Sequence, residues 1–159
     1  MKNKLQSRQK YHYAAIPIEE CAIARAASLL GDKWTLLILR EAIHDVVRFD
    51  QIQHDLGISR TLLTKRLTLL VDEGVLEKVP VQEDGQRPYN SYEFTRKGHA
   101  LMPTLIALGE WSNKHLPGPA SRLSFKHRSC GQKVKTRLVC GCDKGADSHQ
   151  LERVISTSK

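Results

Sequence analysis

A stretch in the middle of the chain, GISRTLLTKRLTLLVDEG at residues 57–74, carries threonines and a cation at helical spacing. At about 3.6 residues per turn they share one helix face: Thr61, Thr64, Lys65 and Thr68. Leucines occupy the opposite face: Leu63, Leu67 and Leu70. Threonine forms helices less well than the Glu, Lys and Gln usual on exposed faces. Hydroxyls beside a cation suit the major groove of DNA. An ordinary solvent-exposed face is the alternative.

A second candidate site lies near the C-terminus, in KHRSCGQKVKTRLVCGCDKG. Its possible ligands would satisfy tetrahedral zinc in a small ribbon: His127, Cys130, Cys140 and Cys142. The Cys-x-Cys spacing is unusual, because cysteines of a zinc knuckle are normally two residues apart. Four interpretations stay open: a zinc site, a site in which His149 replaces one ligand, a redox thiol cluster, and an ordinary basic tail.

The elements that position the threonine stripe follow from periodicity and end signals. Ser59 is a preferred N-cap residue, and Gly74 closes the helix that follows it. Upstream, RFDQIQHDLG repeats apolar residues at helical spacing and ends at Gly57. Two short helices joined by LGIS predict a helix-turn-helix with the second helix as reader.

After Gly74 the apolar residues no longer recur at helical spacing but at every second position. VLEKVP and YNSYEFT alternate, and the polar, turn-forming VQEDGQRP lies between them, which predicts a β-hairpin. A hairpin directly after a recognition helix is a wing, and its tip carries Arg87, placed to reach a phosphate or a minor groove. A plain hairpin packed at the domain edge is the alternative.

Helices are also predicted on both sides of this unit. EECAIARAASLL (19–30) holds Cys21 and ends at Gly31, and Asp32 caps the apolar, buried helix KWTLLILREAIHD. Thr95 caps a long helix, RKGHALMPTLIALGEWSNKHL, in which Pro103 is expected to cause a kink. One side of it is apolar: Leu101, Leu105, Leu108 and Trp111. Such a stripe either packs on a second copy of the chain or closes its own core.

Size and charge limit the remaining classes. The 159 residues suit one domain with extensions, without an apolar run long enough to span a membrane, so a cytoplasmic protein is expected. The net charge of +8 lies in the two ends: residues 1–18 hold four cations and no acids, residues 114–159 hold ten cations and three acids, and residues 48–98 balance. The ends would add non-specific attraction for nucleic acid, or simply keep the protein soluble.

Several matched segments, taken together, resemble the HxlR-type winged helix-turn-helix regulators of bacteria over about residues 16–112. They are IPIEECAIARAASLLGDKWTLLILREAI, RFDQIQHDLGISRTLLTKRLTLLVDEGVLEK and YEFTRKGHALMPTLIALGEW. The resemblance implies a mainly α fold with a small β-hairpin wing. It also implies a homodimer through the terminal helices that regulates transcription by binding an operator in double-stranded DNA, most simply as a repressor.

The resemblance also implies DNA contacts by position: Arg48, Ser59, Arg60, Thr61, Thr64, Lys65, Thr68 and Arg87. The alternatives are structural: Ser59 only caps its helix, Arg48 only pairs with Asp50, and Arg66 lies on the flank. Family members often begin this region with Cys-Pro, and in some of them that cysteine senses oxidants or electrophiles. This chain has Ile16 before Pro17, so that chemistry does not transfer, and Cys21 is expected to be a buried, unreactive thiol.

The predicted organisation is a basic extension (1–15), a DNA-binding and dimerisation domain (16–116), a linker (117–121) and a basic Cys/His-containing extension (122–159). Glycine-rich phosphate loops, catalytic dyad motifs and nucleophile elbows are missing from the sequence, so an enzyme is not expected. A small-molecule or redox effector is a possible partner of this sequence-specific DNA-binding regulator. The alternatives are a thiol- or metal-responsive regulator using Cys130, Cys140 and Cys142, and a general nucleic-acid binder.

Overall fold

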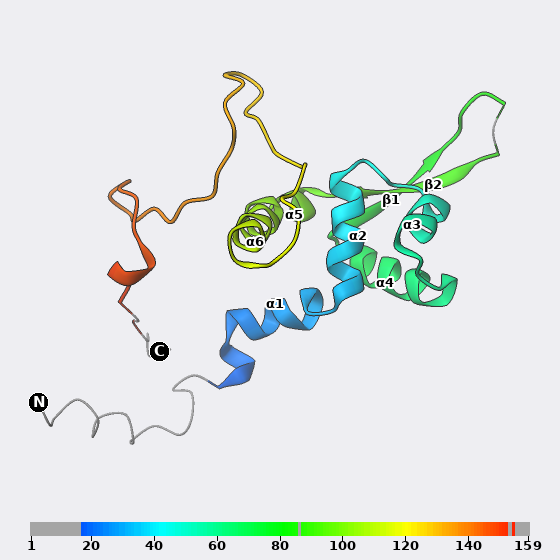
Figure 1. The fold of residues 1–159 in the computed structure, drawn as a ribbon. Coiled ribbons are helices and arrows are strands. Elements are labelled where there is room, and N and C mark those ends of the chain that lie inside the picture. The colour runs from blue at the N-terminus through cyan, green and yellow to red at the C-terminus, as the bar shows by residue number, and fades with distance from the viewer. Residues whose placement is uncertain (1–16, 86, 153, 155–159) are drawn as a thin grey trace, which may run out of the picture.

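The computed structural model describes residues 17–85, 87–152 and 154, and the predicted extension at 1–15 lies outside them. A short 3-10 helix (Ile18–Glu20) leads into α1 (Ala22–Leu30) and α2 (Lys33–Ile43). Then follow α3 (Phe49–Leu56) and α4 (Arg60–Asp72), the strands β1 (Leu76–Val81) and β2 (Tyr89–Phe94), and α5 (Arg96–His99) and α6 (Met102–His115). Figure 1 shows α3 and α4 beside α2, the hairpin projecting past them, and α1 and α6 on the other side of α2.

The core forms where α2, α3, α4 and β1 meet. Its fully buried side chains come from the apolar face of each element: Ile38, Leu39, Ile52, Leu63, Leu67, Leu70, Val75 and Leu76. Removing one such aliphatic side chain from water contributes about 1.5–3 kcal/mol. The predicted burial of the three α4 leucines is confirmed, whereas α2 is buried only in part: Leu37 is 37% exposed.

The ends of the helices follow the predicted caps. The Asp32 carboxylate accepts hydrogen bonds from the amides of Trp34 (3.0 Å) and Thr35 (3.3 Å), and the Ser59 hydroxyl accepts one from the amide of Leu62 (3.4 Å). Gly57 ends α3 in the left-handed conformation, at φ 59°. This backbone geometry favours glycine because it lacks a Cβ, and it sets the turn between α3 and α4.

Two helix predictions need correction. The first helix does not run unbroken from residue 19: Cys21 has extended backbone between the 3-10 helix and α1 and is only half-buried, so it is not the buried helical thiol that was expected. The last helix is split into α5 and α6 just before Pro103. Proline lacks an amide hydrogen, so it suits the first turn of α6 better than a helix interior.

The predicted hairpin is present and is joined to the helices. β1 and β2 pair antiparallel, from Leu76 opposite Phe94 to Val81 opposite Tyr89. The Tyr92 amide also donates a hydrogen bond to the carbonyl of Val47 (2.8 Å), just before α3. The hairpin is therefore held against the helix-turn-helix, as a wing requires.

The C-terminal segment beyond α6 is mostly extended (Figure 1), with isolated antiparallel bridges between Lys126 and Lys133 and between Val139 and Gly145. It is attached to α6 by Glu110, which accepts hydrogen bonds from the amide (3.2 Å) and hydroxyl of Thr136. Within the described residues, every helix is too short or too polar to cross a lipid bilayer.

Candidate nucleic-acid interface

The outward face of α4 is the threonine stripe predicted from the sequence. All its members are exposed, together with the two residues at the start of the helix: Ser59, Arg60, Thr61, Thr64, Lys65 and Thr68. Leu63, Leu67 and Leu70 are at most 1% exposed on the other face. Because the core clamps one face, the other is presented rigidly to solvent. A rigid helix face with hydroxyls and cations has the shape and chemistry that a major groove accepts.

Individual side chains on this face differ in how freely they can move. The Thr64 hydroxyl donates a hydrogen bond to the Arg60 carbonyl (2.9 Å), so its oxygen can still accept a hydrogen bond from a partner. Lys65 forms no ion pair with any described residue, so its ammonium group is available to a phosphate or a base edge. The Arg60 guanidinium lies 5.0 Å from the ring centroid of Phe49, the first residue of α3.

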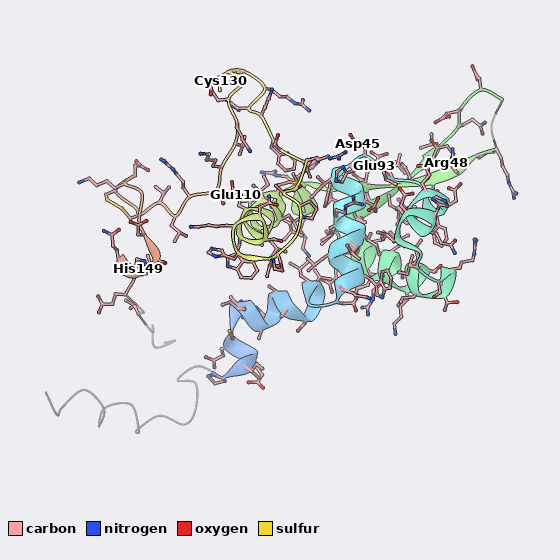
Figure 2. The ribbon with its side chains drawn as sticks, in the orientation of Figure 1. Asp45, Arg48, Glu93, Glu110, Cys130 and His149 are labelled. Carbon is pink, nitrogen blue, oxygen red and sulfur yellow. A yellow bond between two sulfur atoms is a disulfide. The ribbon has the colours of Figure 1, made fainter. Side chains whose placement is uncertain are left out.

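Arg48 joins the wing to the helix-turn-helix. Its guanidinium lies 4.0 Å from the ring centroid of Tyr89 on β2, and its Nε is 3.5 Å from an Asp50 carboxylate oxygen. Figure 2 shows Arg48 where the hairpin meets α3. The pairing with Asp50 that was weighed as a structural alternative is therefore present. A half-buried guanidinium stacked on an aromatic ring has a fixed direction, so Arg48 links β2 of the wing to the start of α3.

The wing loop is braced near its base. The Tyr89 hydroxyl donates a hydrogen bond to a Glu83 carboxylate oxygen (2.6 Å), and this bond raises the pKa of the Tyr89 phenol. Gly85, at φ 75°, forms the turn. Arg87 is exposed on the wing loop, as predicted.

Arg66 has a structural role that the sequence left open. Its Nη2 lies 3.0 Å from the second carboxylate oxygen of Asp32, and its side chain is only 24% exposed. One aspartate thus caps α2 and anchors α4. The alternative that placed Arg66 on the flank is supported. Sequence reasoning found the cap at Asp32 but missed this ion pair and the stacking of Arg48 on Tyr89, since neither pair is marked by a local spacing.

The C-terminal cysteines and histidine are not brought together as four zinc ligands. Cys140 and Cys142 form a disulfide with each other, while His127 Nδ1 lies 3.2 Å from the Cys130 sulfur in the preceding turn. Across the described parts of the chain, no group of three or more His, Cys, Asp or Glu could hold a metal ion. His149 and Cys130 lie at opposite ends of the segment in Figure 2. The four predicted ligands therefore do not converge in this structure. Zinc binding itself stays an untested prediction.

Comparison with known proteins places this geometry in a family. The sequence model of the HxlR-like helix-turn-helix family matches residues 29–119. An uncharacterized HTH-type transcriptional regulator of Mycobacterium tuberculosis is 38% identical over 120 residues, which are 75% of each chain. A Bacillus subtilis regulator of the same description, YvaP, is 31% identical over 91 residues, 57% of this chain and 82% of that protein.

Solved structures agree with the sequence comparisons. The crystal structure of PA1607, described as a transcription factor, superimposes with a TM-score of 0.71 at 30% identity and covers 86% of this chain and 95% of that one. The reduced form of the transcriptional regulator YodB from B. subtilis has a TM-score of 0.51 at 29% identity, covering 62% and 98%. The chain belongs to the HxlR-like helix-turn-helix family of transcriptional regulators.

Proposed function

We propose that this regulator binds operator DNA as a homodimer, with α4 of each protomer in the major groove and the hairpin against the flanking backbone. The observation that carries the proposal is the outward stripe of α4, whose polar side chains are exposed while the leucines of the same helix are buried. Direct readout needs such a fixed, projecting face.

The distribution of charge suggests that the central region supplies specific contacts and the C-terminal region supplies non-specific attraction to DNA. The cations of the central region are balanced by acids over residues 48–98, so specificity rests on where Arg60, Lys65 and Arg87 point rather than on the total charge. The excess of cations beyond residue 113 adds attraction for any phosphate backbone. Repression, by blocking polymerase from its promoter in the cytoplasm, is the simplest way for such a dimer to act.

The dimer is supported by apolar surface on the terminal helices. Ile23 on α1 is 80% exposed, and Leu108 and Trp111 on α6 are 47% and 53% exposed. The predicted α6 stripe is thus divided: Leu101 and Leu105 pack on the core, and its second half faces solvent. Large exposed apolar side chains grouped on neighbouring elements are typical of association surfaces. A two-fold dimer would present two copies of α4 to a palindromic site.

The test compares two variants, each of which loses one positive charge at a different place. A duplex selected from a random library by the wild-type protein is titrated with Lys65→Ala and with Lys144→Ala, in which the lost cation is an exposed one in the C-terminal segment. We expect Lys65→Ala to weaken binding by about 1–3 kcal/mol, roughly 5- to 150-fold, and Lys144→Ala to change it by less than about twofold.

Fluorescence anisotropy at several salt concentrations checks both values, with a scrambled duplex as the specificity control. Equal losses from the two variants, or equal affinity for the two duplexes, would show a general nucleic-acid binder and refute the assignment of α4 as reader.

A further inference from the structure

A cavity of about 650 Å³ lies between α2, α6 and the C-terminal segment. Most of its wall surface is apolar, with Leu36 and Ile43 from α2 and Leu105 and Ile106 from α6. The volume falls within the range of about 300–1,000 Å³ usual for pockets that bind small molecules. The space is therefore large enough, and apolar enough, for an organic ligand.

Cationic side chains line the same cavity. Arg40 comes from α2, where it is ion-paired with the buried Glu41, and Arg122, Lys133 and Lys135 come from the C-terminal segment. Glu110 is the acid among the described lining residues, and its carboxylate is already engaged by Thr136, in hydrogen bonds that hold its pKa below the ordinary value. An apolar space with an excess of positive charge selects a ligand with an apolar body and one negative group.

The cavity is also placed to influence the reader helix. Leu36, Arg40, Ile43 and His44 recur at helical spacing and line the cavity from one side of α2. Ile38, on the opposite side of α2, and Leu39, beside the cavity-lining side, are fully buried in the core shared with α4. A ligand that displaces α2 or α6 would thus shift the packing that orients α4, because a close-packed core transmits strain.

We infer that this cavity binds a small amphipathic anion, an alkyl or aryl carboxylate, and that its occupancy changes the affinity for operator DNA. The second half rests on the proposed function. The C-terminal segment forms one wall of the site, and two hydrogen-bonded contacts hold it to α6: Glu110 with Thr136, and Asn113 with the Ser121 amide (2.9 Å). The excess of cations favours such an anion over an apolar segment of a second copy.

Gly109 offers a variant that fills the cavity without breaking the helix. It lies on α6 and lines the cavity, and no described atom lies within 4 Å of where its Cβ would be, so Gly109→Leu places a side chain in open space. Leucine is also a better helix former than glycine. Ala107→Leu is the matched control, because Ala107 is an exposed residue of the same helix outside the cavity lining.

The full chain is titrated with the fluorescent aryl sulfonate 8-anilino-1-naphthalenesulfonate, and the bound probe is displaced with octanoate or with the uncharged 1-octanol. We expect one saturable site per chain, displacement by octanoate at least about tenfold better than by octanol, and about tenfold or greater loss of probe affinity in Gly109→Leu but not in Ala107→Leu. Replacing Lys133 and Lys135 together with Gln should abolish the preference for octanoate.

Equal probe affinity in the two leucine variants, or equal displacement by octanol, would overturn the site. Octanoate should also shift the affinity for the selected duplex in the wild type and in Ala107→Leu, but not in Gly109→Leu. An unchanged DNA affinity at saturating octanoate would overturn the coupling alone. Probe binding is measured without DNA, so failure of the cavity and failure of the proposed DNA-binding function are told apart.

Discussion

Replacing Asp32 should destabilise the DNA-binding unit through two separable interactions. One oxygen of its carboxylate accepts the two amide hydrogen bonds that cap α2, and the other lies 3.0 Å from Nη2 of Arg66 on α4. Loss of an N-cap costs about 0.5–2 kcal/mol. The ion pair is partly shielded, with side chains 31% and 24% exposed, so it contributes about 1 kcal/mol. We expect Asp32→Ala to lower the free energy of unfolding by about 1.5–3 kcal/mol.

Asp32→Asn separates the two terms, because asparagine keeps the cap and loses the charge. It should cost only about 1 kcal/mol. Urea unfolding followed by circular dichroism, at one chain concentration for all variants, gives these values as shifts in midpoint at constant slope. A double-mutant cycle with Arg66→Met isolates the ion pair, and its coupling energy should be about 1 kcal/mol. A loss in Asp32→Asn as large as in Asp32→Ala, or a coupling energy near zero, would refute this division.

Two further predictions concern the base of the wing and the C-terminal segment. Gly98→Ala should lower the free energy of unfolding by about 1–3 kcal/mol, because the new Cβ would meet the Val75 carbonyl oxygen at 2.1 Å; an unchanged urea midpoint would contradict this close approach. Glu110, whose folded pKa is lowered from 4.5, should hold Thr136 at neutral pH and release it as the pH falls through that lowered value. Limited proteolysis of the C-terminal segment should therefore accelerate in acid for the wild type, whereas Glu110→Gln should show the same rate at both pH values.

Much of the fold could be predicted from the sequence because its signals are local. The caps at Asp32, Ser59 and Thr95 act on amides two or three residues away, and the alternation of the hairpin strands follows from a period of two. The exposed stripe of α4 also followed from periodicity, since a helix with leucines on one face must present its other face outward.

Interactions between distant segments were decided only by the tertiary structure. Neither the stacking of Arg48 on Tyr89 nor the ion pair of Arg66 with Asp32 has a spacing that marks it, because each depends on the angle at which two elements pack. The same reason explains the C-terminal cysteines: a sequence can supply four possible zinc ligands, but the path of the backbone decides whether they converge. Here Cys140 pairs with Cys142, and Cys130 lies beside His127.

Alone, the sequence determined the caps at Asp32, Ser59 and Thr95, the presence of the hairpin and the polar face of the reader helix, because each depends on neighbours within a turn or a strand pair. Folding in three dimensions added the shared use of Asp32 by two helices and the cavity between α2, α6 and the C-terminal segment. Both arise where surfaces of distant segments meet, and their relative placement is set by the packing of the whole core rather than by local propensity.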